Sequence, residues 1–369
     1  MNEENNYNKV NDNVSNKKNI ISILTNRKFL LWLTILIFVF TSITVGKTIY
    51  LRSKVNGYEE FFVEIEKKES KEAVVYLDKE RLDNSLKDVA VLELVSCISS
   101  SIDVENLPKG ITSIIDEINK YYNQSNDYFA FKYKDIYTGF SVGYNENQKI
   151  FTASTIKAPK DIYIYEMASQ GKIDLDEELV YTSRYYNGGT GTLKNKSFNT
   201  KYSIRTLSNY SIVYSDNAAH NMLMDKFGRK NMLVFWKELG TNAIFTQNSN
   251  WGVLNARDAS IYMEELYRFY LEDEIYGQEL MNNFLNAKTM FIKGKNDYKV
   301  AIKSGWSGTA IHDVSIVFAD NPYIVVALSN LGETDYYMSY FNKVNDLAYK
   351  LHTEYWKYKM DMCNDITQY

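Results

Sequence analysis

A serine and a lysine three positions apart, Ser154 and Lys157, are the residues of this chain best suited to covalent chemistry. A serine hydroxyl is a weak nucleophile until a base removes its proton. If a helix begins at Ser154, the two side chains share one face, and a partly desolvated lysine has a lowered pKa that lets it act as that base. The pair predicts serine acyl transfer, although an ordinary surface serine and lysine on a helix have the same spacing.

The segment around this pair is expected to be helical. Residues 161–168 continue the helix, and Gly171 is expected to end it. Pro159 lies early in this helix, where proline is least disruptive.

A second set, Ser215-Asp216-Asn217, precedes an apolar run that ends at Gly228 and is expected in a loop that enters a helix. In an acyl-transfer site Ser215 would pass a proton between Lys157 and the leaving nitrogen. Asn217 would hydrogen-bond the acyl amide of the substrate, and Asp216 is expected to cap the helix. Taken alone, these residues describe a plain helix N-cap.

A third set, Lys303, Ser304 and Gly305, ends an alternating segment that predicts a half-buried strand. A cation and a hydroxyl at a strand end suit a substrate carboxylate, and Gly305 would let a substrate backbone approach closely. The backbone N–H groups of Ser154 and Trp306 would form an oxyanion hole. The alternative is a strand that simply ends in a turn.

The elements that must position these residues are strands and helices in a mixed order. Apolar spacing predicts helices over residues 111–118 and 335–358. Alternation predicts strands over residues 129–134, 140–144, 298–303, 314–319 and 323–328. Because strands at both ends of the region flank helical segments, we expect an α+β fold whose antiparallel sheet is built from both ends.

The three sets, in the order S-x-x-K, S-D-N and K-[ST]-G, resemble the motifs of class A β-lactamases and penicillin-binding proteins. Further similar stretches lie at residues 144–146, 171–176, 188–193 and 306–317. The resemblance covers about residues 110–356. It implies a serine hydrolase with two parts, an antiparallel sheet flanked by helices and an all-α part, with the site between them and with no metal or organic cofactor.

The resemblance also assigns roles to single residues. The catalytic residues it implies are Ser154, Lys157 and Ser215. The substrate-binding residues it implies are Asn217, Lys303, Ser304, Gly305 and Trp306.

One departure from the family concerns release of the acyl group. Class A β-lactamases carry a glutamate in an E-x-x-L-N stretch after S-D-N, and it activates the hydrolytic water. Here Trp251 stands in its place before Leu254 and Asn255; alternatively the loop is shortened and Asn255 begins the next helix. Neither alignment supplies a carboxylate, and the nearest acids, Asp258 and Glu238, are interpreted as structural. We therefore expect complete acylation chemistry and compromised deacylation.

Composition and charge exclude several other functions. The chain has 369 residues, with 42 Lys+Arg against 46 Asp+Glu and a net charge of −4, which does not favour nucleic-acid binding. The three histidines, His220, His312 and His352, lack zinc-binding spacing and are interpreted as packing or structural residues. Two cysteines, Cys97 and Cys363, could pair outside the cell or be two separate buried thiols.

The beginning of the chain predicts membrane attachment. Residues 1–28 are polar and basic, and the apolar run at residues 29–49 approaches the length of a bilayer span. A long n-region without a clear cleavage site favours an uncleaved signal anchor over a cleaved signal peptide, with a cytoplasmic N-terminus. We then expect an extracytoplasmic stalk over residues 50–108, a catalytic domain over 109–358 and a tail over 359–369.

Together these observations predict a membrane-anchored, extracytoplasmic serine hydrolase. Its acyl donor would be a β-lactam or a D-Ala-D-Ala-type peptide. The alternatives are a penicillin-binding D-Ala-D-Ala carboxypeptidase acting on peptidoglycan, and a binding module that captures these ligands without turnover as a sensor. Retention of both Ser154 and Lys157 argues against the module.

Overall fold

The computed structural model describes residue 97 and residues 106–366, apart from 124–128, 247, 248, 294, 296, 309 and 331–334. The predicted N-terminal segment and membrane span lie outside the described residues, as does nearly all of the predicted stalk. Within the described part of the chain, no helix combines the length and apolarity that a membrane crossing needs.

A five-stranded sheet in the order β2-β1-β10-β9-β8 forms the base of the catalytic region, and its recorded strand pairings are antiparallel. Its strands are β1 (Phe129–Asp135), β2 (Ser141–Tyr144), β8 (Lys299–Ser307), β9 (Ala310–Phe318) and β10 (Tyr323–Ser329). Phe129 pairs with Ser329 and Asp135 pairs with Tyr323, so the early strands join the late ones edge to edge. The predicted α+β class and the predicted antiparallel sheet from both ends are confirmed.

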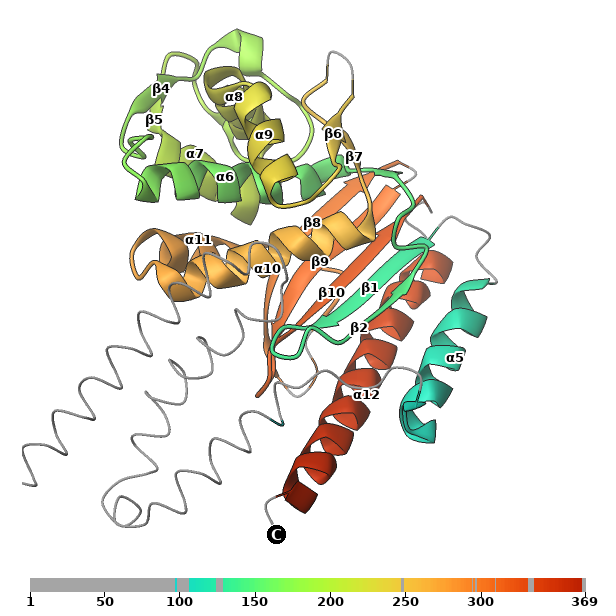
Figure 1. Cartoon of the computed structure of the whole chain (residues 1–369). Coiled ribbons are helices and arrows are strands. Elements are labelled where there is room, and N and C mark those ends of the chain that lie inside the picture. Colours follow the sequence, from blue (N-terminus) through green and yellow to red (C-terminus); the bar gives the residue numbers. More distant parts are fainter. Residues whose placement is uncertain are drawn as a thin grey trace, which may run out of the picture. The chain divides into compact units, whose positions relative to one another are not determined.

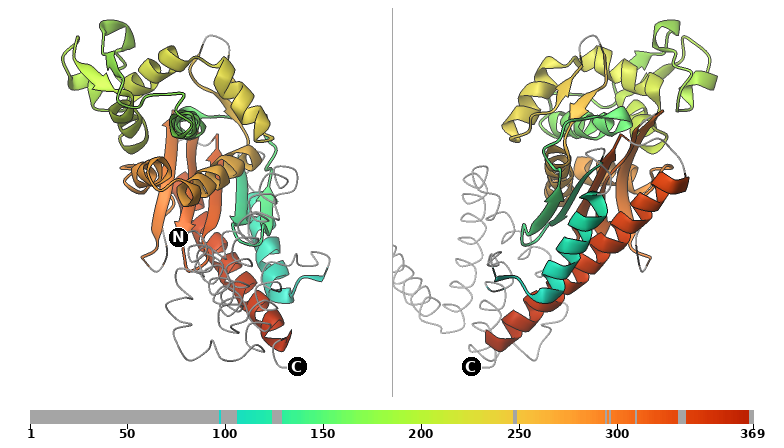
Figure 2. Two further views of the ribbon diagram at one scale, coloured as in Figure 1. Left: turned by 60° about the vertical axis from the view of Figure 1, so that its left-hand side comes forward. Right: turned by 90° about the vertical axis from the view of Figure 1, so that its right-hand side faces the viewer.

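Helices cover both faces of this sheet (Figures 1 and 2). The helices α10 (Ala256–Glu272) and α11 (Tyr276–Leu285) lie on one face, and α5 (Lys109–Asn123) and α12 (Asp335–Ile366) lie on the other. The α12 helix continues beyond the predicted end at Tyr358 to Ile366, so most of the predicted tail is helical.

The predicted half-buried character and end of β8 are both wrong. Residues 300–305 are all buried, because α11, the turn over residues 153–156 and the segment around Thr289 contact this strand. The strand continues through Gly305 to Ser307 and pairs with β9 along its whole length, so Lys303, Ser304 and Gly305 lie inside a strand.

A second, mainly helical part lies beyond one end of the sheet (Figure 1). It contains α6 (Lys157–Ser169), α7 (Ile204–Val213), α8 (Asn217–Phe227) and α9 (Lys230–Glu238), with a small sheet of β4 (Glu178–Val180) and β5 (Lys201–Ser203). Nearly every residue of α6 is buried, because helices of this part and α10 and α11 pack around it. This helix therefore connects the helical part to the sheet part.

A third sheet, also small, lies between the two parts near the predicted nucleophile. Its strands are β3 (Ile150–Phe151), β7 (Gly252–Leu254) and β6 (Ile244–Phe245), in the order β3-β7-β6. A Cβ on Gly252 would lie 2.0 Å from the carbonyl oxygen of Ile244, so only glycine fits this close strand pairing.

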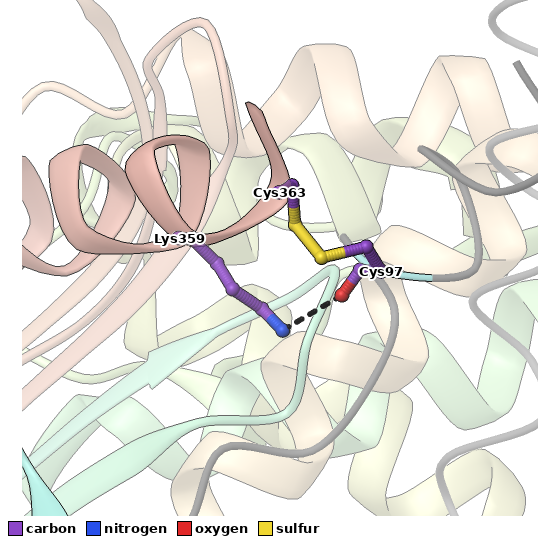
Figure 3. Close-up of a disulfide and its surroundings, with 3 residues drawn as sticks. All are labelled: Cys97, Lys359 and Cys363. Carbon is purple, nitrogen blue, oxygen red and sulfur yellow. Dashed lines mark hydrogen bonds between the residues drawn. A yellow bond between two sulfur atoms is a disulfide. The ribbon is translucent and has the colours of Figure 1, made fainter. Parts of the chain in front are cut away.

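Cys97 and Cys363 form a disulfide near the end of α12 (Figure 3). The buried Lys359 donates a hydrogen bond of 2.9 Å to the carbonyl oxygen of Cys97 beside it. Of the two alternatives that the sequence left open, the paired form is the one present.

Candidate active site

The nucleophile lies in a tight turn rather than in the first turn of an α-helix. Ser154 belongs to a 3₁₀ turn over Ala153–Ile156, and α6 begins only at Lys157. Ala153 has a φ of 41°, a left-handed conformation that costs a residue with a side chain about 1–3 kcal/mol. Such strain is typical of functional sites, and here it directs the chain into the turn that presents Ser154.

Lys157 lies directly against the serine, as predicted. Its Nζ is 3.1 Å from the Ser154 Oγ, 3.3 Å from the Ser215 Oγ, and 2.7 Å from both the Ser215 carbonyl oxygen and the Asn217 Oδ1. An ammonium group has only three N–H donors for these four acceptors. A neutral amine has a lone pair instead of the third proton, and this lone pair can accept the Ser154 hydroxyl proton.

Ser215 bridges two lysines. Its Oγ accepts hydrogen bonds from the Lys157 Nζ at 3.3 Å and from the Lys303 Nζ at 3.0 Å. Ser215 has a φ of 53°, again a left-handed conformation in a residue with a side chain. The two lysines come from α6 and β8, so the Ser215 hydroxyl joins the helical part to the sheet part at the centre of the site.

The electrostatics of the site favour neutral lysine. Burial, followed by repulsion from Lys303 and Lys160, holds the pKa of Lys157 well below the ordinary lysine value. Burial also lowers the pKa of Lys303 to about 7, although Asp313 opposes this shift. A proton on Lys303 therefore disfavours a proton on Lys157.

Asp216 is the predicted helix cap and also holds a neighbouring loop. Its carboxylate accepts hydrogen bonds from the backbone N–H of Ala219 at 3.0 Å, Thr192 at 2.6 Å and Leu193 at 2.7 Å. Gly191 has a φ of +116°, and a Cβ there would lie 2.3 Å from the Asp216 carboxylate. The sequence showed a family likeness in this loop but did not reveal that it fixes the S-D-N turn.

Asn217 faces the cleft and is held on both sides. Its Oδ1 accepts from Lys157 at 2.7 Å and from the Thr190 Oγ1 at 3.4 Å, and its Nδ2 donates to the Asn187 Oδ1 at 3.3 Å. The predicted role of this amide in binding a substrate stays a prediction, and its exposure to the cleft is compatible with that role.

Lys303 and Ser304 are buried, and their predicted role in binding a substrate carboxylate stays a prediction. Lys303 is 1% exposed, and its Nζ donates to the Ser215 Oγ and to the Ser304 carbonyl oxygen. The Ser304 hydroxyl donates to the Thr289 carbonyl oxygen at 2.8 Å. Both side chains are buried, and each already has a protein partner.

Gly305 has a different structural role from the predicted one. A Cβ at this position would lie 2.9 Å from the Ser154 backbone nitrogen and 3.0 Å from that of Thr155. The missing side chain therefore lets β8 contact the nucleophile turn, rather than giving space to a substrate. This contact brings Trp306 to the same cleft as Ser154, where the predicted oxyanion hole would form.

A cleft of about 540 Å³ opens in front of Ser154. Its lining consists of Phe151, Ala153, Ser154, Gly189, Thr190, Lys194, Asn217, Trp251, Trp306 and Ser307. Three of these residues are aromatic, one is a lysine and none carries a carboxylate. Among the described residues no group of acidic, histidine or cysteine side chains is arranged to hold a metal ion.

The segment where class A enzymes carry their glutamate is a hairpin here. Asn255 caps α10, since its Oδ1 accepts from the Asp258 backbone N–H at 2.7 Å, which confirms that the next helix begins at Asn255. Trp251, just before β7, still lines the cleft, with its ring 5.3 Å from that of His220. The tryptophan therefore forms part of the cleft wall beside Ser154.

The nearest acids and the histidines are structural, as predicted. Asp258 lies in the first turn of α10 and accepts a hydrogen bond from the Asn242 backbone N–H at 2.8 Å. Glu238 is exposed at the end of α9 and does not line the cleft. The buried His312 donates from Nε2 to the Phe151 carbonyl oxygen at 2.7 Å, and His352 pairs with the Tyr133 hydroxyl at 3.0 Å.

Comparisons with solved structures agree with this architecture. A β-lactamase from Sphaerobacter thermophilus is 15% identical, with a TM-score of 0.58, and the match covers 66% of this chain and 95% of that one. A mutant of PBP-A, solved as an acyl-enzyme complex with penicillin G, is 19% identical, with a TM-score of 0.60 and coverage of 68% and 100%. No curated protein sequence matches the chain.

An ancestral class A β-lactamase of Gram-negative bacteria is 18% identical, with a TM-score of 0.56 and coverage of 66% and 99%. At these identities the structural matches show the fold alone. The sequence itself matches the family described as "Beta-lactamase enzyme family" over residues 113–351, a range that contains all three motifs. The chain belongs to the beta-lactamase enzyme family and has its serine hydrolase fold.

Proposed function

We propose that this protein is a serine hydrolase in which β-lactams acylate Ser154 and leave slowly. The observation that carries the proposal is the contact of 3.1 Å between the Lys157 Nζ and the Ser154 Oγ, made by a buried lysine whose pKa is well below its ordinary value. A serine paired in this way with a neutral amine has the nucleophile and base that acyl transfer requires.

Acylation uses the three central side chains in sequence. Neutral Lys157 takes the hydroxyl proton of Ser154 while the Ser154 Oγ bonds to the lactam carbonyl carbon. The backbone N–H groups of Ser154 and Trp306 stabilise the negative charge on the carbonyl oxygen. Ser215 then gives its proton to the leaving nitrogen as the C–N bond breaks, and recovers a proton from Lys157.

Lys303 links substrate charge to this proton transfer. A carboxylate that enters the cleft near Ser215 favours the protonated form of Lys303, whose pKa is about 7 in the free protein. The resulting cation repels a proton from Lys157, because both lysines contact the same Ser215 hydroxyl. An anionic substrate would thus help to convert Lys157 into the base.

Deacylation lacks its usual general base. None of the described residues that line the cleft carries a carboxylate, and Trp251 cannot accept a proton from water. The same lack supports the second candidate, a penicillin-binding D-Ala-D-Ala carboxypeptidase, for which slow release of a β-lactam adduct is expected. PBP-A, a solved structure of similar fold, forms an acyl-enzyme with penicillin G in a mutant form. A sensor that captures ligands without turnover is the third candidate.

We also propose that the enzyme is anchored in the cell membrane by residues 29–49, with its catalytic domain outside the cytoplasm. The apolar run supports the anchor, and the disulfide between Cys97 and Cys363 supports an oxidising compartment. Cell fractionation, followed by protease treatment of intact spheroplasts, would digest the catalytic domain if this orientation is correct. Protection from protease would contradict it.

Turnover assays separate the three candidates. The full chain is incubated with a chromogenic cephalosporin and, separately, with a diacyl-L-Lys-D-Ala-D-Ala peptide, with Ser154→Ala as the control. Our proposal predicts slow, Ser154-dependent cephalosporin hydrolysis. Release of D-alanine would favour the carboxypeptidase, an adduct without either product would favour the sensor, and equal rates in Ser154→Ala would contradict the site.

A further inference from the structure

A buried ion pair lies on α6 and has no part in the chemistry described above. Lys160 and Asp161 are both 0% exposed, and the Lys160 Nζ lies 2.8 Å from the Asp161 Oδ2. Ser211, on α7, completes the cluster: its Oγ accepts from Lys160 at 2.9 Å and donates to the Asp161 Oδ2 at 3.0 Å. The Asp161 Oδ1 is buried without a hydrogen-bond partner.

Stability alone is a poor explanation for this pair. Removing two charges from water is costly, and a buried ion pair often stabilises a fold no better than apolar side chains of similar volume. The orphaned Asp161 Oδ1 adds to that cost. A fully buried ion pair with an unsatisfied oxygen in the helix that follows the nucleophile therefore indicates a use for its charges.

The position of the pair suggests that use. Lys160 follows Lys157 by three residues in α6, so the two side chains lie on one face of the helix, one turn apart. Both are fully buried, and Lys303 is 1% exposed. Charges separated by protein rather than by water interact strongly, so Lys160 and Asp161 act on both lysines of the site.

The pair acts in opposite senses on those two lysines. On Lys157, repulsion from Lys160 is stronger than attraction to Asp161, so the pair lowers its pKa. On Lys303, attraction to Asp161 is stronger than repulsion from Lys160, so the pair raises its pKa. The other charged or titratable groups around Lys157 are Lys303 from β8, Asp216 before α8 and His220 within α8.

We propose that the Lys160–Asp161 pair sets the charge states of the two active-site lysines. It keeps Lys157 neutral as the base and Lys303 protonated for an anionic substrate. The inference rests on the proposed function, because it presumes that Lys157 activates Ser154. It goes beyond that function by assigning the different charge states of two similar buried lysines to a cluster that does not contact the substrate.

The test is the pH profile of Ser154 labelling in the full chain, purified in mild detergent. The probe is a fluorophosphonate, which reacts with an activated serine without requiring β-lactam recognition, and labelling is followed by intact mass from pH 5 to pH 10. Lys160→Met removes the cation, so Lys157 gains a proton more readily whether or not Asp161 stays ionised. We expect the acid limb of the profile to move to higher pH. At a fixed pH on that limb, each pH unit of this shift lowers the labelling rate roughly tenfold, whereas labelling at pH 10 should be near normal.

Two further variants make the test specific. Lys160→Met/Asp161→Asn removes both charges and should shift the acid limb in the same direction by a smaller amount. If circular dichroism shows that Lys160→Met does not fold, the double variant tests the proposal in its place. Lys134→Met/Glu264→Gln is the control, because it neutralises another ion pair, one of 2.6 Å between β1 and α10, whose residues do not line the cleft. Its profile should match the wild type.

Two results would overturn the proposal. One is an unchanged acid limb in a folded Lys160→Met or double variant, and the other is a uniform loss of rate at all pH values, which would indicate a purely structural role. Labelling of the wild type by the fluorophosphonate but not by penicillin would contradict the proposed function and leave this inference standing. Absence of labelling by either probe would contradict both.

Discussion

Gly305 and the backbone nitrogen of Ser154 are so close that a Cβ on Gly305 would lie only 2.9 Å from that nitrogen. The contact joins the strand of the K-S-G motif to the turn of the nucleophile. The two motifs come from opposite ends of the catalytic region in the sequence, and their relative position depends on the absence of one side chain. The alignment of the cleft should therefore depend on this glycine.

Gly305→Ala should impair acylation of Ser154 by about a hundredfold, because the strand or the nucleophile turn must shift to make room and small displacements of reacting groups are costly. The rate of adduct formation with penicillin measures the effect. Gly110→Ala, in α5, is the matched control, since its added methyl group would meet only the flexible end of Glu354. A Gly305→Ala rate within threefold of the control would contradict our account of the contact.

Lys157→Met should reduce acylation by about 10²–10⁴-fold, the usual contribution of a positioned base, while circular dichroism stays native. In the wild type, the rate should rise with pH through a pKa below the ordinary lysine value of 10.5, because burial disfavours the charged form. Lys172→Met is the control, as Lys172 is exposed and away from the cleft. Equal rates in the two variants would remove Lys157 from the mechanism.

The sequence predicted which residues meet at this site better than it predicted their detailed geometry. Ser154, Lys157, Ser215, Asn217 and Lys303 do come together, because short motifs require specific residue types at fixed local spacing. The sheet was predictable for a similar reason, since alternation is a local property of a strand.

The missed features all depend on contacts between distant segments. The K-S-G motif was expected at a strand end, but nothing local reveals that residues 300–305 of β8 are buried throughout. The hydrogen bonds from the Thr192 and Leu193 backbone N–H groups to Asp216 could not be predicted either. Gly191, in a glycine-rich stretch, was nevertheless a signal for a close backbone approach. Nothing in the local sequence indicated that Lys160 and Asp161 form a buried ion pair.

Acid should destabilise the fold through His312. Its Nδ1 accepts from the Ser329 backbone N–H at 3.1 Å and its Nε2 donates to a carbonyl oxygen, so the ring must be neutral in the fold. Burial lowers its pKa to about 4. The neutral ring contributes stability fully above the unfolded pKa of about 6.5, and that contribution is lost as the pH falls toward 4.

Denaturant unfolding of the wild type and His312→Gln measures this effect. The difference in unfolding free energy between the two proteins should shrink by about 3 kcal/mol between pH 7 and pH 4, because glutamine does not titrate. A difference that stays constant across this range would contradict the assigned ring state.

Loss of the disulfide should affect stability and not chemistry. Cys97→Ser/Cys363→Ser should lower the free energy of unfolding by about 2–4 kcal/mol, because the unfolded chain regains conformational freedom. Acylation of Ser154 should be unchanged, since the C-terminal end of α12 lies away from the helical part that carries α6 (Figure 1). Unfolding in urea and a penicillin labelling assay on the same sample test both halves of the prediction.

The central claim is that Ser154 is acylated by β-lactams and released slowly. Intact-protein mass spectrometry of the full chain mixed with penicillin G, followed from seconds to hours beside Ser154→Ala, tests it most directly. The account predicts a one-to-one adduct on the wild type that lasts for hours, and no adduct on Ser154→Ala. An adduct that disappears within seconds would contradict slow deacylation, and no adduct on the wild type would contradict β-lactam recognition itself.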